Sequence, residues 1–266
     1  MPIPKILLLI MTLYAFSSCS KSAAGSDAEP LLPDPTTSLR EQYSMPTSKW
    51  PSAEWYEGIR AQELAPLSQG PINTQQQQKV IALGKVLFFD PRVGRGEKTC
   101  ATCHHPDIYW VDRRQTAAGI ATHHRNTPSM ENVWYVKGQL FHDGRAKTYA
   151  EQIAEAIESP IEMGGNTYTL PVKLAAIKGY HHLFDEAYGD ANITRTRILD
   201  ALAIYSQSIV SGETHFDRFI QGDYTALSDQ QIEGLHLFRT KGKCINCHHG
   251  PYLTDLQYHN LGYAVD

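Results

Sequence analysis

The sequence lacks long runs of charge of either sign. Its 266 residues include 24 basic and 28 acidic side chains, which gives a formal net charge of −4. Binding to nucleic acid depends on clustered lysine and arginine side chains, so this pattern excludes a nucleic acid partner. The sequence also lacks a convincing run in which apolar and polar residues alternate, which argues against a β-sheet. With 42% hydrophobic residues, it has the composition of an ordinary globular protein.

An apolar segment long enough to cross a membrane comfortably is also missing. The stretch from Ile6 to Phe16 is too short for a bilayer. Ser17 and Ser18 precede Cys19, so residues 1–19 resemble a bacterial lipoprotein signal peptide with lipidation at Cys19. A plain secretory signal or an uncleaved anchor is the alternative. In each case the chain leaves the cytoplasm, and we expect it in the periplasm, lipid-anchored to a membrane.

Cysteine is scarce, and its positions are informative. Apart from Cys19, the cysteines occur in two copies of one pattern, Cys100-Ala101-Thr102-Cys103-His104 and Cys244-Ile245-Asn246-Cys247-His248. Two thiols three positions apart lie on one side of a helical turn, where each can bond to a vinyl group of haem, and the next histidine can bind the iron. A thioredoxin-like redox pair needs no such histidine, and a zinc site needs two further ligands. The spacing predicts two covalently bound haem c groups, with a redox pair or a zinc site as the alternative.

Residues 20–70 are rich in proline, serine and glutamate, and the prolines interrupt any long helix. We interpret this segment as a Pro-rich tether. Its later part contains Trp50, Trp55 and Tyr56, and three aromatic residues rarely gather in a disordered tail. We therefore expect this later part to pack on the folded body.

Helical patterns dominate the remaining sequence. Capping residues precede apolar segments of helical period at four places: Thr74, Thr148 with Glu151, Thr194, and Ser228 with Gln231. The first of these helices should end at Phe89, before Asp90-Pro91. The predicted fold class is all-α, with long loops at residues 94–99 and 107–128 that would wrap a cofactor.

Several short motifs lie in the same order and spacing as in a known family. They are Leu83-Gly84-Lys85, Phe88-Phe89-Asp90-Pro91, Arg125-Asn126-Thr127-Pro128, Asp143-Gly144-Arg145, Gln152, Glu162-Met163, Phe216-Asp217-Arg218 and Gly222-Asp223, together with the two haem motifs. On these motifs the chain resembles the bacterial dihaem cytochrome c peroxidases and the related MauG-like proteins, from about Gln75 to its end. The resemblance implies two cytochrome c-like haem domains, a peroxidatic one at residues 71–226 and an electron-transfer one at residues 227–266.

The resemblance also implies an activity, the reduction of hydrogen peroxide to water by electrons from a small carrier, a cytochrome c or a blue copper protein. The iron held by His104 would react with peroxide, and the iron held by His248 would take electrons from the carrier. Glu162 would be the catalytic acid and base, and Gln152 would shape the same pocket. Outside this family context, Glu162 would be interpreted as a solvated loop carboxylate. The resemblance further implies calcium at Asn126, with an ordinary turn residue as the alternative, and allows a homodimer.

The sequence departs from the family near the first haem. Where many members have a tryptophan before Asp143-Gly144-Arg145, this chain has His142. We expect a packed, hydrogen-bonded histidine there, with ligation or proton transfer as the alternative. In many of these peroxidases a loop histidine binds the first iron in the resting state, and His123 and His124 are candidates for this distal ligand. The alternative is that both are surface histidines and that the iron is already open to peroxide. Two further histidines are expected at the surface: His105 and His249.

The chain also departs from the family at its end. No methionine follows Met163, and the tyrosines and the histidine that follow His248 lie too close to it to match the distant Met or Tyr ligand of the second iron. We therefore expect a truncated chain in which the second haem domain is incomplete. Two alternative functions stay open: a MauG-like dihaem oxidase that acts on a protein substrate, and a truncated, non-catalytic haem c protein.

Overall fold

The computed structural model describes residues 38–68, 70–71 and 74–262. Within these ranges the protein is helical, and isolated β-bridges occur in place of strands. The helices are α1 (Leu39–Tyr43), α2 (Gln75–Phe89), α3 (Tyr149–Glu158), α4 (Leu170–Ala175), α5 (Lys178–Tyr188), α6 (Arg195–Gln207), α7 (His215–Ile220) and α8 (Asp229–Arg239). The all-α prediction is confirmed. None of the described helices has the length and apolar character needed to cross a membrane. The predicted signal peptide, with Cys19, lies outside the described residues.

Side-chain caps fix where the four predicted helices begin. Thr74, Thr148 and Ser228 each accept a hydrogen bond from the backbone N–H three residues later, and the side chain of that later residue bonds back to the cap. Thr194 accepts the equivalent bond from the backbone N–H of Arg197. Each cap satisfies backbone groups that the first turn of a helix leaves unpaired. The four predicted helix starts are confirmed.

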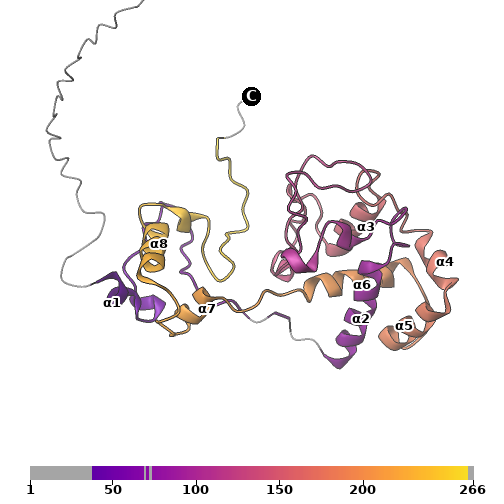
Figure 1. Ribbon diagram of the computed structural model, residues 1–266, viewed down its shortest axis with the longest axis horizontal. Helices are drawn as coiled ribbons and strands as arrows, with labels where there is room; N and C mark the ends of the chain where they lie inside the picture. Colours follow the sequence, from indigo (N-terminus) through magenta and orange to yellow (C-terminus); the bar gives the residue numbers. More distant parts are fainter. Residues whose placement is uncertain (1–37, 69, 72–73, 263–266) are drawn as a thin grey trace, which may run out of the picture. The chain divides into compact units, whose positions relative to one another are not determined.

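The first of two hydrophobic cores forms where α2 packs against α6, and α3 and α5 contribute to it (Figure 1). Apolar residues at helical spacing supply it, among them Val80, Leu83 and Leu87 of α2 and Ile198, Leu202 and Tyr205 of α6. Gly84 lets the two helices approach closely, because a Cβ atom there would lie 2.0 Å from the carbonyl oxygen of Ala201. The approach accounts for a glycine inside a helix, where it is otherwise unfavourable by about 1 kcal/mol relative to alanine.

The second core joins part of the Pro-rich segment to α7 and α8. Tyr43, Trp50 and Leu64 are buried there with Phe219 and Ile232. The structure therefore differs from a solvated tether at these three positions of the Pro-rich segment, whereas Met45 and Tyr56 of the same stretch are exposed. It agrees with the expectation that the later part of the segment packs on the folded body. The domain boundaries at residues 70 and 226 stay predictions.

A buried ion pair attaches the Pro-rich segment to α8. The side chain of Arg239 is 1% exposed, and its guanidinium bonds to both carboxylate oxygens of Glu63. It also donates to the hydroxyl of Tyr43 and to the carbonyl oxygen of Pro51, each at 2.8 Å. The guanidinium carbon lies 5.2 Å from the centroid of the Trp50 ring. A buried charge needs partners of this kind, and here most of them come from the Pro-rich segment.

The same segment holds the second haem motif. The buried amide of Asn246, between the two cysteines, accepts a hydrogen bond from the backbone N–H of Tyr56 at 2.6 Å. It donates to the carbonyl oxygen of Glu54 at 3.0 Å. Lys243, directly before the motif, forms an ion pair with the Glu54 carboxylate. The turn that carries the second pair of thiols is therefore positioned by residues far earlier in the chain.

Candidate haem site

Both haem motifs form the same backbone turn. A 3-10 helix covers Cys100–Thr102 in the first motif and Cys244–Asn246 in the second. The backbone N–H of His104 donates to the carbonyl oxygen of Cys100 at 3.0 Å, and His248 makes the equivalent bond to Cys244 at 2.9 Å. The four described cysteines form no disulfide bond. Two copies of one sequence pattern thus give two copies of one local geometry.

The motif histidines are held in one tautomer. The Nδ1 atom of His104 lies 3.0 Å from the carbonyl oxygen of Trp110, and that of His248 lies 3.0 Å from the carbonyl oxygen of Leu253. A carbonyl oxygen only accepts, so Nδ1 carries the proton in each ring and Nε2 keeps its lone pair. Burial also lowers the pKa of His104, which favours the neutral ring. A neutral imidazole with a free Nε2 is the form that binds iron.

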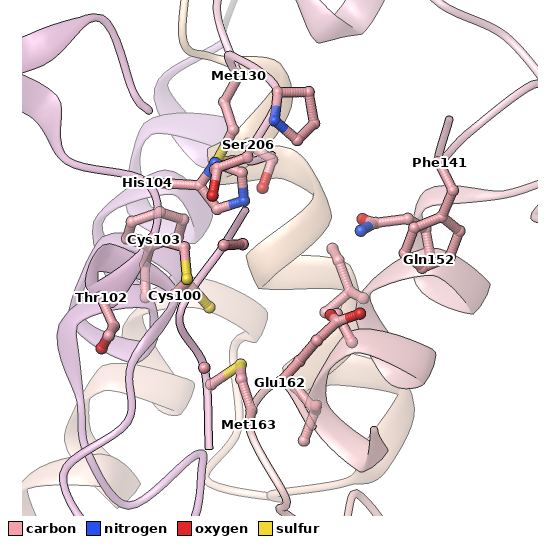
Figure 2. A pocket seen from close by; sticks show the side chains of 18 of the residues that line it. Cys100, Thr102, Cys103, His104, Met130, Phe141, Gln152, Glu162, Met163 and Ser206 are labelled. Carbon is pink, nitrogen blue, oxygen red and sulfur yellow. The ribbon is translucent and has the colours of Figure 1, made fainter. Parts of the chain in front are cut away.

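A cavity lies beside the first motif and contains about 1340 Å³ of space between atoms, part of it open to solvent. Cys100, Cys103 and His104 line one side, and Gln152 and Glu162 face them from the other (Figure 2). Apolar side chains supply much of the remaining wall, among them Phe88, Met130, Leu140, Phe141, Ile153 and Leu202. An apolar pocket with a few convergent polar groups is the usual form of a cofactor site.

Most of the residues predicted for the first site line this one cavity. His123, Asn126 and His142 line it with the two predicted catalytic residues, whereas His124 is exposed and is not among the lining residues. The Nε2 atom of His142 donates to the backbone carbonyl oxygen of Asn126 at 3.1 Å, and the residue is exposed. His142 is therefore hydrogen-bonded, as expected, but not buried. Calcium at Asn126 and a distal ligand at His123 or His124 stay predictions.

The predicted acid and base has an unusual electrostatic setting. Gln152 is on α3, and Glu162 follows this helix on a loop. Burial raises the pKa of the Glu162 carboxyl, and the nearby His123 and Arg145 offset part of this rise. The Nε2 atom of His123 lies 3.3 Å from Oε1 of Glu162. A raised pKa makes the carboxylate a stronger base than an exposed glutamate, on the side of the cavity opposite His104.

Comparison with known proteins identifies the family. The sequence between residues 78 and 225, more than half of the chain, matches the family described as di-haem cytochrome c peroxidase. The chain belongs to this family. The methylamine utilization protein MauG of Methylophilus methylotrophus is 38% identical over 72% of this chain and 58% of its own length. Cytochrome c551 peroxidase of Nitrosomonas europaea is 32% identical over 71% of this chain and 57% of its own length. The chain thus spans less than two thirds of these curated members of the dihaem peroxidase family.

The dihaem peroxidase fold is also found among solved structures. A MauG-like protein associated with microbial copper homeostasis has a TM-score of 0.62, with 23% sequence identity over 77% of this chain and 61% of that chain. The diheme peroxidase BthA from Burkholderia thailandensis has a TM-score of 0.55, with 24% identity over 75% of this chain and 59% of that chain. At these identities the likeness concerns the fold, which agrees with the predicted cytochrome c-like haem domains.

The residues of the first site fit the haem that this family carries. Cys100 and Cys103 supply two thiols, and His104 supplies an imidazole whose tautomer suits iron. Burial raises the pKa of the Cys100 thiol to about 12. A thioredoxin-like redox pair needs a thiol of low pKa, so this shift argues against the redox alternative. The apolar wall and the two thiols match the needs of a covalently bound porphyrin.

The second motif is more open than the first. Cys244 and His248 are exposed. His105 is exposed as predicted, but the prediction of a surface position for His249 is wrong, because this side chain is 8% exposed. The ring of Trp55 meets it edge to face, with 5.9 Å between centroids. The Pro-rich segment therefore covers a histidine that its sequence neighbours suggested would be solvated.

Three side chains next to the second motif form a group that could hold a metal ion. The ligand atoms of Cys247, Asp255 and His259 lie within 4.8 Å of one another. Nε2 of His259 lies 2.7 Å from the carboxylate of Asp255. The Cys247 thiol is also the one that the haem motif uses. Haem attachment and metal binding at this group therefore exclude each other.

Sequence reasoning missed several residues that line the cavity. They include Met130, Phe141, Tyr149 and Ser206. Ser206 follows Leu202 by four positions on the buried side of α6, so a polar residue in an apolar helix face was an available signal. Met130 and Phe141 lie in irregular segments, where no period links sequence to position.

Proposed function

We propose that the chain carries the peroxide-reducing site of a cytochrome c peroxidase-type oxidoreductase with two covalently attached haem c groups. The reaction is hydrogen peroxide plus two electrons and two protons to two waters, with a small redox carrier as the electron donor. The observation that carries this proposal is the placement of Glu162 and Gln152 across the cavity from His104 (Figure 2). An acid and base on the face opposite an iron ligand is what peroxide reduction needs.

The chain's own groups handle the protons. Haem, when bound, supplies the iron that takes peroxide and the electrons that break its O–O bond. Glu162 accepts a proton from the oxygen that faces it and returns this proton to the leaving oxygen, which departs as water. The buried setting that raises its pKa strengthens the base for the first transfer. The Gln152 amide has both a donor and an acceptor with which to orient peroxide.

The second motif serves electron entry in this proposal. The repeat of the CxxCH sequence and of its backbone turn at Cys244–Asn246 supports a second haem there, through which electrons from the carrier would pass. The proposal includes the periplasm as the location, lipid attachment at Cys19 and calcium at Asn126. A carboxamide oxygen is a suitable ligand for such a hard cation.

The test compares two carboxylate-to-amide variants of the haem-loaded protein. Glu162→Gln should lower kcat/KM for peroxide by about 10²- to 10⁴-fold, since this is the usual contribution of general acid–base catalysis. Glu97→Gln makes the same chemical change on an exposed loop residue and should stay within about twofold of the wild type. Failure of the wild type to oxidise a reduced carrier with peroxide, or equal rates for all three proteins, would remove the basis of the proposal.

A second candidate function is a MauG-like oxidase that acts on a protein substrate. The MauG relative of Methylophilus methylotrophus, at 38% identity, favours it. Peroxide-dependent oxidation of a reduced carrier and of a protein substrate should be measured on the same haem-loaded preparation. Rapid turnover of the carrier supports the peroxidase, whereas oxidation confined to a protein substrate supports the oxidase.

A further inference from the structure

We propose that His123 is a positioning residue, whose Nε2–H group holds the Glu162 carboxylate in place on the open side of the haem cavity. This inference rests on the proposed peroxidase function and adds a residue to its proton-transfer site. It also distinguishes between two roles for His123, as a partner of Glu162 and as a ligand of the iron.

The two side chains face each other inside the cavity. Nε2 of His123 lies 3.3 Å from Oε1 of Glu162, and both residues line the cavity. Their side chains are 25% and 27% exposed, so water has limited access to the pair. A hydrogen bond to a charged group is stronger than one between neutral groups, and partial burial strengthens it further.

The backbone determines which nitrogen of His123 carries the proton. The backbone N–H of Arg125 donates to Nδ1 of His123 at 3.1 Å. Nδ1 must therefore be the acceptor, and the neutral ring carries its proton on Nε2, toward Glu162. Both nitrogens are then engaged. Binding of the iron by His123 would require one of these two contacts to break.

The loop that carries His123 is attached to the segment that carries Glu162. The backbone N–H of Ile120 donates to the carbonyl oxygen of Glu162 at 2.8 Å, and that of Ala121 donates to Ile161 at 3.0 Å. At Gly119 an added Cβ atom would lie 2.5 Å from the same Glu162 oxygen, so the approach requires glycine. These backbone contacts fix the His123 loop next to the Glu162 segment and so keep the two side chains close to each other. A loop that moved away from this segment would separate them.

The test uses the haem-loaded protein and replaces the histidine in two ways. His123→Leu removes the donor, and His123→Gln keeps an N–H donor on a neutral side chain. His182→Leu is the matched control, because His182 also pairs with a glutamate, at 3.5 Å from Glu186, on the exposed surface of α5. We expect His123→Leu to slow the reaction with peroxide by roughly 10- to 100-fold, the usual range for one hydrogen bond to a charged group. His123→Gln should recover most of this loss, and His182→Leu should show none.

Three further measurements distinguish positioning from other roles. The visible and EPR spectra of the resting ferric protein should not change in His123→Leu, whereas loss of an iron ligand would convert a low-spin signal to a high-spin one and overturn the proposal. In a Glu162→Gln background, His123→Leu should have little additional effect, because its partner is already gone. Additive losses in the double variant, or a fall in melting temperature that accounts for the slower rate, would also contradict it.

Cyanide binding separates this inference from the proposed function. Hydrogen cyanide must give up a proton to bind ferric haem, so its binding rate reports on Glu162 without peroxide turnover. A wild type that does not turn over peroxide, but whose cyanide binding slows in His123→Leu and recovers in His123→Gln, would refute the peroxidase and retain the pairing. Equal cyanide binding in the wild type and His123→Leu would refute the pairing itself.

Discussion

Replacing Glu63 with alanine removes the carboxylate that neutralises the guanidinium of Arg239. Arg239 is 1% exposed and would keep its bonds to the Tyr43 hydroxyl and the Pro51 carbonyl oxygen. None of the partners that remain among those described carries a negative charge. Breaking a buried pair on one side typically costs about 3–5 kcal/mol. Glu63 is 30% exposed, so we take the lower end, about 3 kcal/mol, to allow for solvent screening.

Thermal unfolding of the haem-loaded protein measures this loss. For a domain of this size, 1 kcal/mol shifts Tm by about 2–4 °C, so Glu63→Ala should lower Tm by roughly 6–12 °C. Glu57→Ala is the control, because it removes an exposed carboxylate from the same Pro-rich segment and should shift Tm by no more than about 2 °C. Equal melting of the two variants would show that the Glu63–Arg239 ion pair does not stabilise the fold.

The remaining predictions concern α2, α3 and the cavity. Gly84→Ala should lower Tm, because the overlap with α6 costs about 1–3 kcal/mol and outweighs the roughly 1 kcal/mol that alanine adds in a helix; unchanged melting would refute the close approach. Thr148→Ala should cost about 1 kcal/mol of unfolding free energy through loss of the α3 cap, measured in urea. Burial acts to raise the pKa of Asp90, but hydrogen bonds to its carboxylate outweigh burial and hold the pKa below 3.8. The ionised carboxylate therefore stabilises the folded protein fully above pH 3.8, and this contribution is lost as the pH falls through the lower pKa of the native state. Acid unfolding should accordingly be less steep in Asp90→Asn. The peroxide reaction should slow as the pH falls through the pKa of Glu162, which burial raises above 4.5, and a stopped-flow midpoint below 4.5 would contradict this.

Three helices that begin at a capping box, α2, α3 and α8, were predicted because the box is local, whereas the box of Thr214 and Asp217 before α7 was missed. Thr148 and Glu151, for example, encode the start of α3 within four residues. α5 was not predicted, and Ile177 at its N-cap position makes no side-chain hydrogen bond to the helix. A helix whose start depends on tertiary packing has no capping residue from which its first turn can be predicted.

The site shows the same contrast between local and distant information. The CxxCH spacing predicted the thiols and His104, and family resemblance predicted Gln152 and Glu162. The contact between His123 and Glu162 was not predicted, since it depends on the backbone path of an irregular loop. The burial of His249 was missed because its cover comes from Trp55, almost two hundred positions earlier.

The hydrogen bonds between the Pro-rich segment and the second haem motif determine which part of the protein can fold first during synthesis. Tyr56 and Asn246 are separated by 190 positions, so the ribosome releases one partner long before it makes the other. The first cavity uses residues between Phe88 and Ser206 and can close while the later chain is still emerging. Until α8 appears, the side chains of Trp50 and Leu64 have no core to enter and are exposed to chaperones and proteases. We therefore expect pulse-labelled nascent chains to become protease-resistant around the first motif before they do so around the second.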